Sequence, residues 1–344
     1  MSEARVNAPG AWQPVVDHWG PFASRSIPDD SVIIADARVL RLHKKMLRSL
    51  SGHRLISMTA GETAKSLTTL SQLAAKTLTV SRQVTLIALG GGTIGDLTTV
   101  FAHLLKRGVR LIQVPSTLLA AVDSSVGGKG AVNVGEVKNA LGVFHYPDES
   151  WLCPQLFTTL TEAQRREGRL EAYKMALGEA KLWASWSSRQ PDDETLIAES
   201  RALKAKICAR DPYERTGQRT ALNFGHTFGH VIEAVTHHRV RHGEAVGLGM
   251  LCALDVGVAL GVTPVHLAQE VEGALPNAPG ARRRLARVLH RVSATRVSQL
   301  LAADKKGSAQ GSVRMVLLAK PGRWALEPVS PKVWSRLFGT WSTR

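Results

Sequence analysis

The chain has 344 residues, of which 44% are hydrophobic and 21% charged, a balance typical of a folded globular protein rather than a disordered one. No apolar run approaches the roughly 20 residues that a membrane helix needs, so we expect no membrane protein. The three cysteines are too widely spaced for a metal knuckle or a redox motif, and the N-terminus lacks an apolar secretory segment. These features favour a cytoplasmic location.

The charge balance is strongly positive, with 44 Lys and Arg against 28 Asp and Glu and a net charge of +16. This excess favours an anionic partner. Aromatic residues make up only 5%, and the basic residues are spread along the chain, so we do not expect nucleic-acid binding. The densest basic cluster, residues 281–291, is predicted to be the solvated face of a helix. A small phosphorylated acid as substrate would explain part of the charge through electrostatic steering.

The first half of the chain alternates short apolar runs with helical stretches. Strands are predicted at residues 31–36, 54–60, 84–90 and 109–115, each a continuous apolar run that is typical of a parallel sheet covered on both faces. Ligands are then expected at the carboxyl ends of these strands.

The second half, after about residue 160, consists mainly of long amphipathic segments and is predicted to be helical. Residues 145–160 contain two prolines and interrupt both the strand pattern and the helical pattern of apolar residues. We therefore predict two domains, an α/β domain over residues 1–158 and a mostly α-helical domain over residues 159–344. A strand-like segment at 312–319 is expected to pack onto the helical domain.

Two glycine-rich segments follow the predicted strands. In residues 88–100 a strand ends in three glycines and a helix is expected to begin after Gly95 and Asp96, which suits an anion at a helix N-terminus. The segment lacks the G-x-G-x-x-G fingerprint, so nucleotide binding and an ordinary turn both stay open. Residues 114–147 are predicted to form a phosphate-holding loop that contains Asp123, Lys129, Lys138 and Asn139.

A third segment contains histidines with metal-ligand spacing. His226 and His230 lie at i and i+4 on one predicted helical face, and His242 follows. Imidazoles with one carboxylate form a common ligand set for a catalytic zinc with an open coordination position. Glu171 could supply that carboxylate, although Glu171 and Lys174 at i and i+3 are equally explained as a salt bridge.

Taken together, these motifs resemble the 3-dehydroquinate synthase family of sugar-phosphate cyclases. GGGTIGD, KRG, VPSTLLAAVDSSVGGK, KN, E-x-x-K, N-x-G-H-T-x-G-H, HGEAV and DKK occur in family order, between about residues 31 and 318. The resemblance implies an N-terminal Rossmann-like α/β domain that binds NAD, a mostly α-helical C-terminal domain that binds metal, and a homodimer.

The resemblance also assigns residues to the site. It implies that zinc or cobalt is held by Glu171, His226 and His242, and that His230 takes part in proton transfer. The implied NAD contacts are Asp36, Glu62, Lys65, Gly91, Gly92, Asp96, Ser116, Thr117 and Lys138. The residues implied to line the pocket for an anionic sugar-phosphate acid are Asp123, Lys129, Asn139, Lys174, Lys204, Arg219 and Asn223, and Arg107 is implied to reach the phosphate of a neighbouring subunit.

The implied reaction converts 3-deoxy-D-arabino-heptulosonate 7-phosphate into 3-dehydroquinate and phosphate. It proceeds by transient oxidation by NAD, β-elimination of phosphate, re-reduction and intramolecular aldol closure, so that net redox is zero. Related alcohol and glycerol dehydrogenases share the architecture but would form NADH.

One stretch departs from the family pattern, and two lysine assignments stay open. The approach to the metal helix, residues 209–226, is one residue longer than usual, so either Lys204 or Lys206 could be the substrate lysine, with Lys204 favoured. The same stretch, with DPYERTG, resembles cyclases of secondary metabolism, and an aminodehydroquinate or 2-deoxy-scyllo-inosose type of activity is the alternative. In the DKK motif, spacing does not decide between Lys305 and Lys306.

Overall fold

The computed structural model describes residues 12–135, 137–276, 278–290, 292–304 and 312–343, so the alternative lysines Lys305 and Lys306 lie outside the described residues. The chain divides into two compact units. The first unit contains the described residues up to Arg165 together with Ile197–Tyr213, and the second contains Arg166–Leu196 and the described residues from Glu214 onward. A single division at 158/159 therefore does not describe these units, because a helical segment beyond it returns to the first one.

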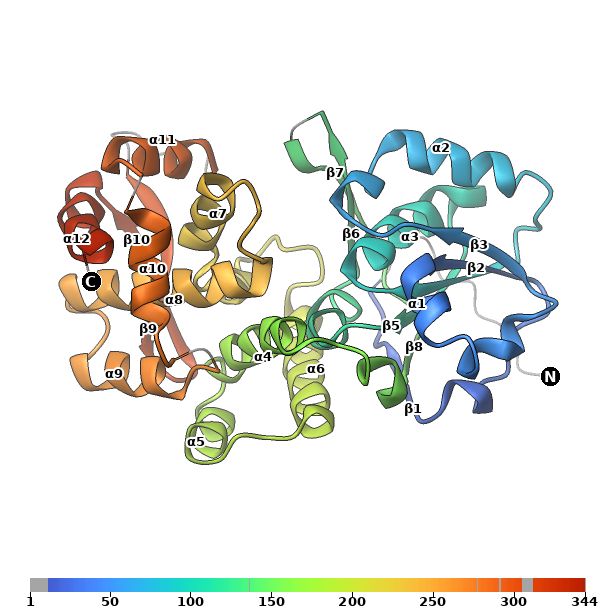
Figure 1. Cartoon of the computed structure of the whole chain (residues 1–344), viewed down its shortest axis with the longest axis horizontal. Helices are drawn as coiled ribbons and strands as arrows, with labels where there is room; N and C mark the ends of the chain where they lie inside the picture. The colour runs from blue at the N-terminus through green and yellow to red at the C-terminus, as the bar shows by residue number, and fades with distance from the viewer. Residues whose placement is uncertain (1–11, 136, 277, 291, 305–311, 344) are drawn as a thin grey trace. The chain divides into compact units, whose positions relative to one another are not determined.

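The first unit is built on a six-stranded sheet in which every neighbouring pair is parallel. Its order is β1-β8-β5-β4-β2-β3 (Figure 1). The strands are β1 (Val16–Trp19), β2 (Ser31–Asp36), β3 (Arg54–Met58), β4 (Thr85–Gly90), β5 (Arg110–Pro115) and β8 (Glu149–Leu152). The four predicted strands are confirmed. The prediction for residues 145–160 was wrong in part, since β8 lies within the segment expected only to break the pattern.

The two faces of the sheet bury alternate residues of each central strand. In β2, Val32 and Ile34 pack in one core with helices α2 (Leu67–Lys76) and α3 (Gly92–Leu104). Ile33 and Ala35 pack in the other core, beside α1 (Ala37–Leu42) and the 3-10 turn Met46–Leu50. Because successive side chains of a strand point to opposite faces, a strand that is buried on both faces must be apolar at every position.

Helix α3 starts earlier than the sequence suggested. We expected it to begin after Gly95 and Asp96, but it begins at Gly92 with Gly91 as its N-cap. A Cβ on Gly95 would lie 3.0 Å from the side chain of Gln113 on β5, so the glycine lets the helix approach the sheet closely. Asp96 consequently lies within the helix.

The expected phosphate-holding loop also has regular structure. Residues Ala120–Ser124 form a π-helical turn, and β6 (Lys129–Val134) pairs with β7 (Val137–Phe144) as an antiparallel hairpin. A Cβ on Gly130 would lie 2.8 Å from the carbonyl oxygen of Asp96, so this glycine lets the hairpin pack against α3. Gly130 thus serves close packing, whereas Gly135, with a φ of +58° and open space around it, serves the turn of the hairpin. The remaining 3-10 turns of this unit are Phe22–Ser24, Glu62–Ala64, Leu105–Arg107 and Pro154–Phe157.

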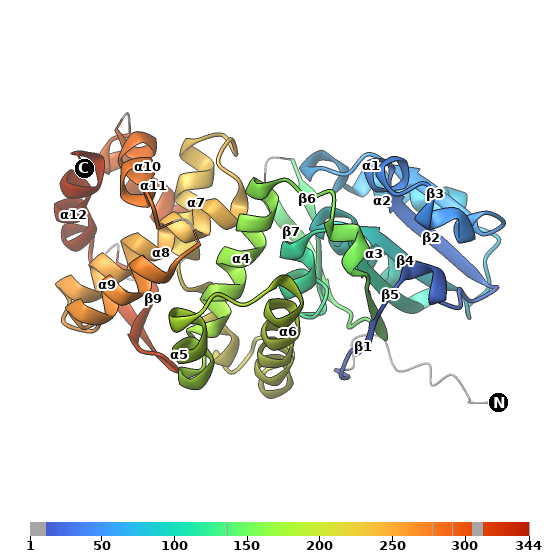
Figure 2. The same cartoon turned by 60° about the horizontal axis from the view of Figure 1, so that its bottom comes forward.

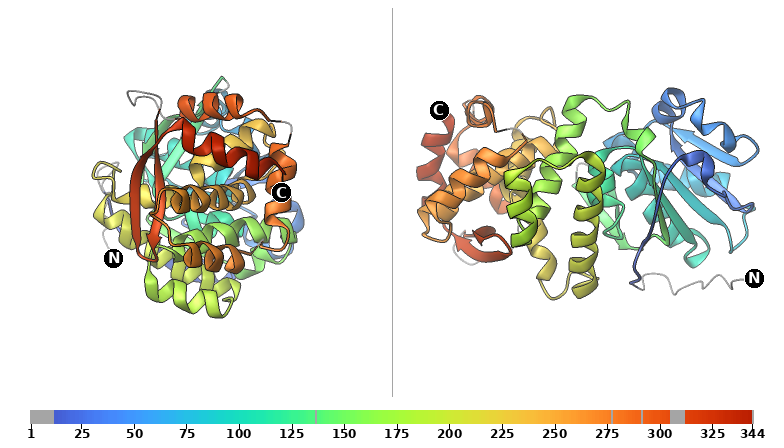
Figure 3. Two further views of the ribbon diagram at one scale, coloured as in Figure 1. Left: turned by 90° about the vertical axis from the view of Figure 1, so that its left-hand side faces the viewer. Right: turned by 90° about the horizontal axis from the view of Figure 1, so that it is seen from below.

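The second unit is mainly helical, as predicted (Figure 2). Its helices are the later part of α4 (Glu162–Ala176), α5 (Ala180–Ser188), the start of α6 (Asp193–Arg210), α7 (His226–Val235), α8 (His242–Ala259), α9 (Val265–Ala274), α10 (Ala281–Leu289), α11 (Ala294–Asp304) and α12 (Pro331–Thr343), with a 3-10 turn at Gln218–Asn223. The predicted C-terminal strand is confirmed as β9 (Val313–Lys320), which pairs with β10 (Arg323–Val329) in a curved ribbon (Figure 3). The hydroxyl of Thr263 donates to the carbonyl of Leu318 at 2.7 Å and so ties β9 to the end of α8.

Helices α7 and α8 pack so closely that only glycine fits between them. A Cβ on Gly249 would lie 2.1 Å from the carbonyl oxygen of Gly225 and 2.6 Å from the backbone nitrogen of Gly229. Helix α8 is also the one described helix long and apolar enough to cross a membrane, but 72% of its window is buried inside the fold. A buried core helix of a soluble protein has the same length and composition, so α8 gives little support for a membrane-spanning segment.

Some arginines of α10 are paired with carboxylates of neighbouring helices and do not form the solvated face that was predicted. Arg282 forms ion pairs with Asp255 and Glu272, and Arg284 lies 3.2 Å from a carboxylate oxygen of Glu244. The prediction for residues 281–291 was therefore wrong for these two side chains, which link α10 to α8 and α9. Partly buried guanidinium groups of this kind contribute to packing rather than to recognition of an external anion.

Candidate functional site

The carboxyl edge of the sheet contains a topological switch point. From β2 the chain runs outward to β3 and then returns to β4 on the other side of β2, so a crevice forms beyond the ends of β2 and β4. Asp36 ends β2, and Gly91 and Gly92 follow β4 at the start of α3. No side chain of the described chain caps this helix start, and its first turn contains no acidic residue, so its N–H groups can receive a phosphate.

A hollow at this edge joins further predicted residues. Asp36, Ser116 and Thr117 line it together with His43, Thr159 and Gln164. One ring nitrogen of His43 lies 2.9 Å from the hydroxyl of Thr159, and burial lowers the pKa of His43. The last three residues had no motif in the sequence to mark them. His43 follows α1, whereas Thr159 and Gln164 lie more than 100 residues later in the chain, so only the fold brings them to one hollow.

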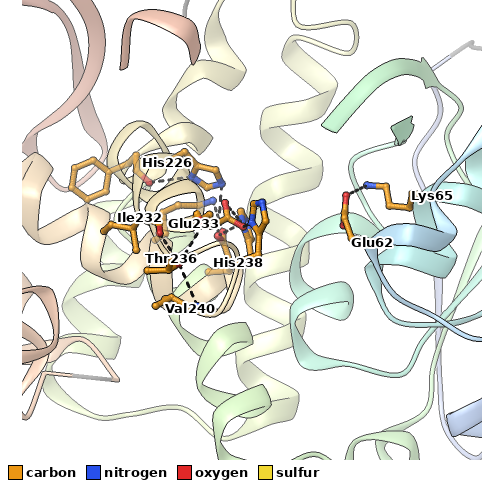
Figure 4. A network of polar contacts seen from close by, with 12 residues as sticks. Glu62, Lys65, His226, Ile232, Glu233, Thr236, His238 and Val240 are labelled. Atoms are coloured by element: carbon orange, nitrogen blue, oxygen red, sulfur yellow. Dashed lines mark hydrogen bonds and ion pairs between the residues drawn. The ribbon is translucent and has the colours of Figure 1, made fainter. Parts of the chain in front are cut away.

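Lys65 is the centre of a buried polar cluster in the first unit. Its ammonium donates to the carboxylate of Asp96 and to the side-chain oxygen of Asn139, both at 2.7 Å, and lies 3.9 Å from Glu62 (Figure 4). Burial raises the pKa of Asp96, and the nearby charge of Lys65 opposes that rise. The structure thus joins residues assigned to NAD with Asn139, which was assigned to the substrate pocket.

Asp123 and Lys204 form a second pair in the same unit. The ammonium of Lys204 lies 2.6 Å from a carboxylate oxygen of Asp123 and 2.5 Å from its backbone carbonyl. Lys204 is 5% exposed, whereas Lys206, two residues further along the helix, is exposed. The structure therefore distinguishes the two lysines that spacing left open, because only Lys204 faces Asp123.

Three other predicted residues of the first unit lie on its β6–β7 hairpin or next to its sheet. Lys129 and Lys138 are exposed on the β6–β7 hairpin. Arg107 follows α3 and precedes β5, so it lies at the edge of the sheet opposite to Gly91 and Gly92.

The second unit brings together the three side chains that were predicted to hold a metal, Glu171, His226 and His242. One carboxylate oxygen of Glu171 lies 3.8 Å from Nε2 of His226 and 3.7 Å from Nε2 of His242. These separations are too long for hydrogen bonds but suit donor atoms around one cation. His226 and His242 are the first residues of α7 and α8, so the close glycine packing of these helices fixes both imidazoles. Such a donor set fits a divalent metal.

The surroundings of Glu171 support this fit. Glu171 is 1% exposed, and its other carboxylate oxygen is paired with the ammonium of Lys174. The oxygen that faces the histidines accepts no hydrogen bond from the described chain. Glu171 can therefore be a metal ligand and a salt-bridge partner of Lys174 at the same time. One of its carboxylate oxygens makes the salt bridge, and the other is available as a ligand.

Glu233 and Glu167 flank the metal-binding cluster and were missed from sequence. A carboxylate oxygen of Glu233 lies 3.4 Å from Nδ1 of His242, and the other lies 3.9 Å from His238 (Figure 4). Burial alone would lower the pKa of His242, but the hydrogen bond to Glu233 and the charge of Glu171 raise it. A ligand imidazole is commonly oriented by a carboxylate at its second nitrogen. Glu233 is seven residues after His226 on α7, a helical spacing that could have revealed it.

The remaining predicted residues of this unit lie close to His226 in the sequence. His230 is exposed, and its ring centroid lies 5.7 Å from that of His226. Arg219 is buried in the 3-10 turn Gln218–Asn223, and Asn223 ends the same turn. These side chains lie on the segment that leads into the first metal-binding histidine.

Gly243 sets the position of His242, and we predict that Gly243→Ala weakens metal binding. A Cβ there would lie 2.5 Å from the carbonyl oxygen of Glu167, so the first turn of α8 must shift. We expect metal affinity to fall by roughly 10- to 100-fold, the range for a disturbed ligand orientation, as measured by chelator competition. The matched control is Gly273→Ala in α9, where the added Cβ meets nothing within 4 Å. Equal metal affinity in both variants would contradict this packing argument.

The first unit is a Rossmann-like α/β fold with a topological switch point, and the second is a mainly helical fold in which three side chains could hold a metal ion. These features define a class of two-domain proteins. Residues 55–167 match the family model described as 3-dehydroquinate synthase N-terminal, and residues 168–307 match the one described as 3-dehydroquinate synthase C-terminal. The chain belongs to the 3-dehydroquinate synthase family.

Curated relatives agree with this assignment. The chain is 36% identical over 307 residues to a 3-dehydroquinate synthase of Endomicrobium trichonymphae, covering 85% of this chain and 83% of the relative. It is 41% identical over 254 residues to a 3-dehydroquinate synthase of Campylobacter concisus (strain 13826), covering 71% and 73%.

Among solved structures, the fold is similar to 2-epi-5-epi-valiolone synthase from Streptomyces hygroscopicus subsp. jinggangensis 5008, solved with NAD+ and Zn2+ bound. The TM-score is 0.82 at 24% identity, covering 98% of this chain and 99% of that one. It is also similar to a 2-deoxy-scyllo-inosose synthase solved with carbaglucose-6-phosphate, NAD+ and Co2+, with a TM-score of 0.80 at 22% identity, covering 95% and 98%. At these identities the likeness shows the predicted fold.

Proposed function

We propose that this protein is a phosphate-eliminating lyase that converts 3-deoxy-D-arabino-heptulosonate 7-phosphate into 3-dehydroquinate and phosphate. The observation that carries the proposal is the cluster of Glu171, His226 and His242, with Lys174 on the same carboxylate, in a chain of this family. Curated relatives that are 34–41% identical to this chain are named 3-dehydroquinate synthase. The cyclases for other sugar phosphates are similar at only 22–24% identity.

NAD and a divalent metal, either zinc or cobalt, are the proposed cofactors. When bound, NAD supplies reversible oxidation of a substrate hydroxyl, and the metal supplies a Lewis acid for adjacent hydroxyls. Asp36, Gly91 and Gly92 would hold the dinucleotide at the switch point. Glu62, Lys65, Asp96, Ser116, Thr117 and Lys138 are its further proposed contacts.

The residues of the chain then bind the substrate and move its protons. A substrate with both a carboxylate and a phosphate needs fixed cations, since these offset the cost of removing its charges from water. We assign this role to Lys129, Lys174, Lys204 and Arg219, and assign His230 to proton transfer. Asp123, Asn139 and Asn223 can position hydroxyls by hydrogen bonds.

We also propose that the protein is a cytoplasmic homodimer in the pathway to aromatic amino acids. The position of Arg107 at the edge of the sheet opposite to Gly91 and Gly92 agrees with a role toward a neighbouring subunit rather than within its own chain. We expect sedimentation to give a dimer, and activity to fall in Arg107→Ala. A fully active monomer would contradict this part of the proposal.

The test of the activity is phosphate release from 3-deoxy-D-arabino-heptulosonate 7-phosphate with NAD and zinc, with the organic product identified by mass and NMR. We expect 3-dehydroquinate, and we expect an EDTA-treated sample to release no phosphate until metal is restored. Product from an aminated analogue or from glucose 6-phosphate, but not from the heptulosonate, would identify another cyclase. Metal-independent release would contradict the assigned metal site.

A further inference from the structure

The cationic face of α6 contains a residue that the proposed function does not yet include. Arg201 and Lys204 lie at i and i+3, and both reach the π-helical turn Ala120–Ser124. Lys204 contacts Asp123 itself. Arg201 is 2% exposed, and its guanidinium is held among backbone and side-chain acceptors of the same unit. A buried arginine with such contacts fixes the geometry of the groups around it.

Arg201 uses its two ends for different partners. Its Nε and one terminal nitrogen donate to both carboxylate oxygens of Asp17 in β1, a bidentate pair with the Nε bond at 2.7 Å. Its other terminal nitrogen donates to the carbonyl oxygen of Ala121 and to the hydroxyl of Ser125, both at 2.7 Å. The guanidinium therefore connects the edge strand to the π-helical turn.

The backbone of the turn explains why this contact is needed. The N–H of Ser125 bonds to the carbonyl of Ala120, as in a π-helix, but the next N–H, that of Val126, bonds to the carbonyl of Asp123. The carbonyl of Ala121 lies where the π-helical pattern stops, and it accepts from Arg201 at 2.7 Å and more weakly from the hydroxyl of Ser125 at 3.4 Å. Single π-helical turns are frequent at functional sites, where they orient one side chain.

We infer that Arg201 is a positioning residue, which fixes the π-helical turn so that Asp123 and Lys204 keep the geometry that substrate binding and turnover need. The two groups that Arg201 contacts, Ala121 and Ser125, stand on either side of Asp123. Asp17 orients the guanidinium from the opposite side. This inference rests on the proposed function of Asp123, but the state of the turn can be measured without substrate.

The first part of the test is amide hydrogen exchange of the folded protein over peptides that cover residues 117–126. We compare the parent with Arg201→Met and Arg201→Lys, and with Arg210→Met as control, because Arg210 is an exposed arginine on the same helix. We expect faster exchange at Ser125 and Val126 in Arg201→Met, a smaller increase in Arg201→Lys, and none in Arg210→Met. Unchanged exchange in Arg201→Met would overturn the inference.

The second part is a separation of kcat from KM with the heptulosonate phosphate. A misplacement of about 1 Å costs up to roughly a hundredfold in rate, so we expect kcat of Arg201→Met to fall at least tenfold. Arg201→Lys should recover part of this loss. Bound metal should stay stoichiometric, because its donors lie in the other unit. A loosened turn with unchanged kcat would overturn the positioning role.

Failure of the role of Arg201 and failure of the proposed activity give different results. If Arg201→Met does not fold, the Arg201→Lys variant decides, and parental exchange and parental kcat in that variant would overturn the inference. If the parent protein itself does not turn over the heptulosonate phosphate, the proposed function fails. The exchange data then still decide whether Arg201 holds the turn.

Discussion

His242→Ala is expected to release the divalent metal and to lower turnover by about a thousandfold or more, while the helical unit stays folded. Loss of a Lewis acid worth several kcal/mol of transition-state stabilisation gives a rate effect of this size. The side chain of His242 is 38% exposed, so its removal takes little from the core. Metal content by elemental analysis and phosphate release measure the two effects together.

The control for this variant is His266→Ala, which removes an exposed imidazole from α9 in the same unit. It should keep both metal and activity, and circular dichroism should show parental helix content in both variants. Stoichiometric zinc in His242→Ala would mean that this histidine is not a ligand. Loss of helix content would mean that its role is structural.

Lys204→Met is expected to lower kcat/KM by roughly 10- to 100-fold, since a hydrogen bond between charged groups is worth about 1.5–3 kcal/mol. The lysine bonds to both the side chain and the backbone carbonyl of Asp123, so its loss removes a cation from both groups. Steady-state kinetics with the heptulosonate phosphate measure the effect.

Lys206→Met is the matched control, because it makes the same change two residues away on an exposed position of α6. Its kcat/KM should stay within about twofold of the parent, as for surface substitutions in general. The reverse order of effects would show that the substrate lysine had been chosen wrongly.

The strands predicted from sequence were those that are buried on both faces. In β4 every position is buried, and in β2 every position before the terminal Asp36 is buried, so each run stands out in the sequence. The two strands of this sheet that were missed are β8, which pairs with β5, and β1, which pairs with β8 at the edge of the sheet. In β1, Val16 is 53% exposed and Trp19 is 38% exposed, and four residues with mixed polarity do not indicate a strand.

Glycines were the main source of error. A glycine-rich segment predicts a loop, but Gly130 and Gly142 allow close packing within and around the β6–β7 hairpin. The start of α3 was misplaced for the same reason, because a helix that opens with glycines has no residue preference to mark it. Only the neighbouring atoms in the fold distinguish these uses.

The local part of the candidate site could be predicted, whereas its long-range part could not. The spacings of Glu171 with Lys174 and of His226 with His230 place them on common helical faces. The pair between Arg201 and Asp17 joins residues 184 positions apart, and no single sequence indicates such a contact. The choice of Lys204 over Lys206 also depended on the direction in which α6 faces Asp123.

The measurement that tests the central claim most directly is turnover of 3-deoxy-D-arabino-heptulosonate 7-phosphate with less NAD than substrate. An enzyme that oxidises and then re-reduces its substrate consumes no NAD. We therefore predict complete conversion into 3-dehydroquinate, one phosphate per product, and no accumulation of NADH. Formation of one NADH per turnover would identify a dehydrogenase, and no phosphate release by folded, metal-loaded protein would contradict the proposed function.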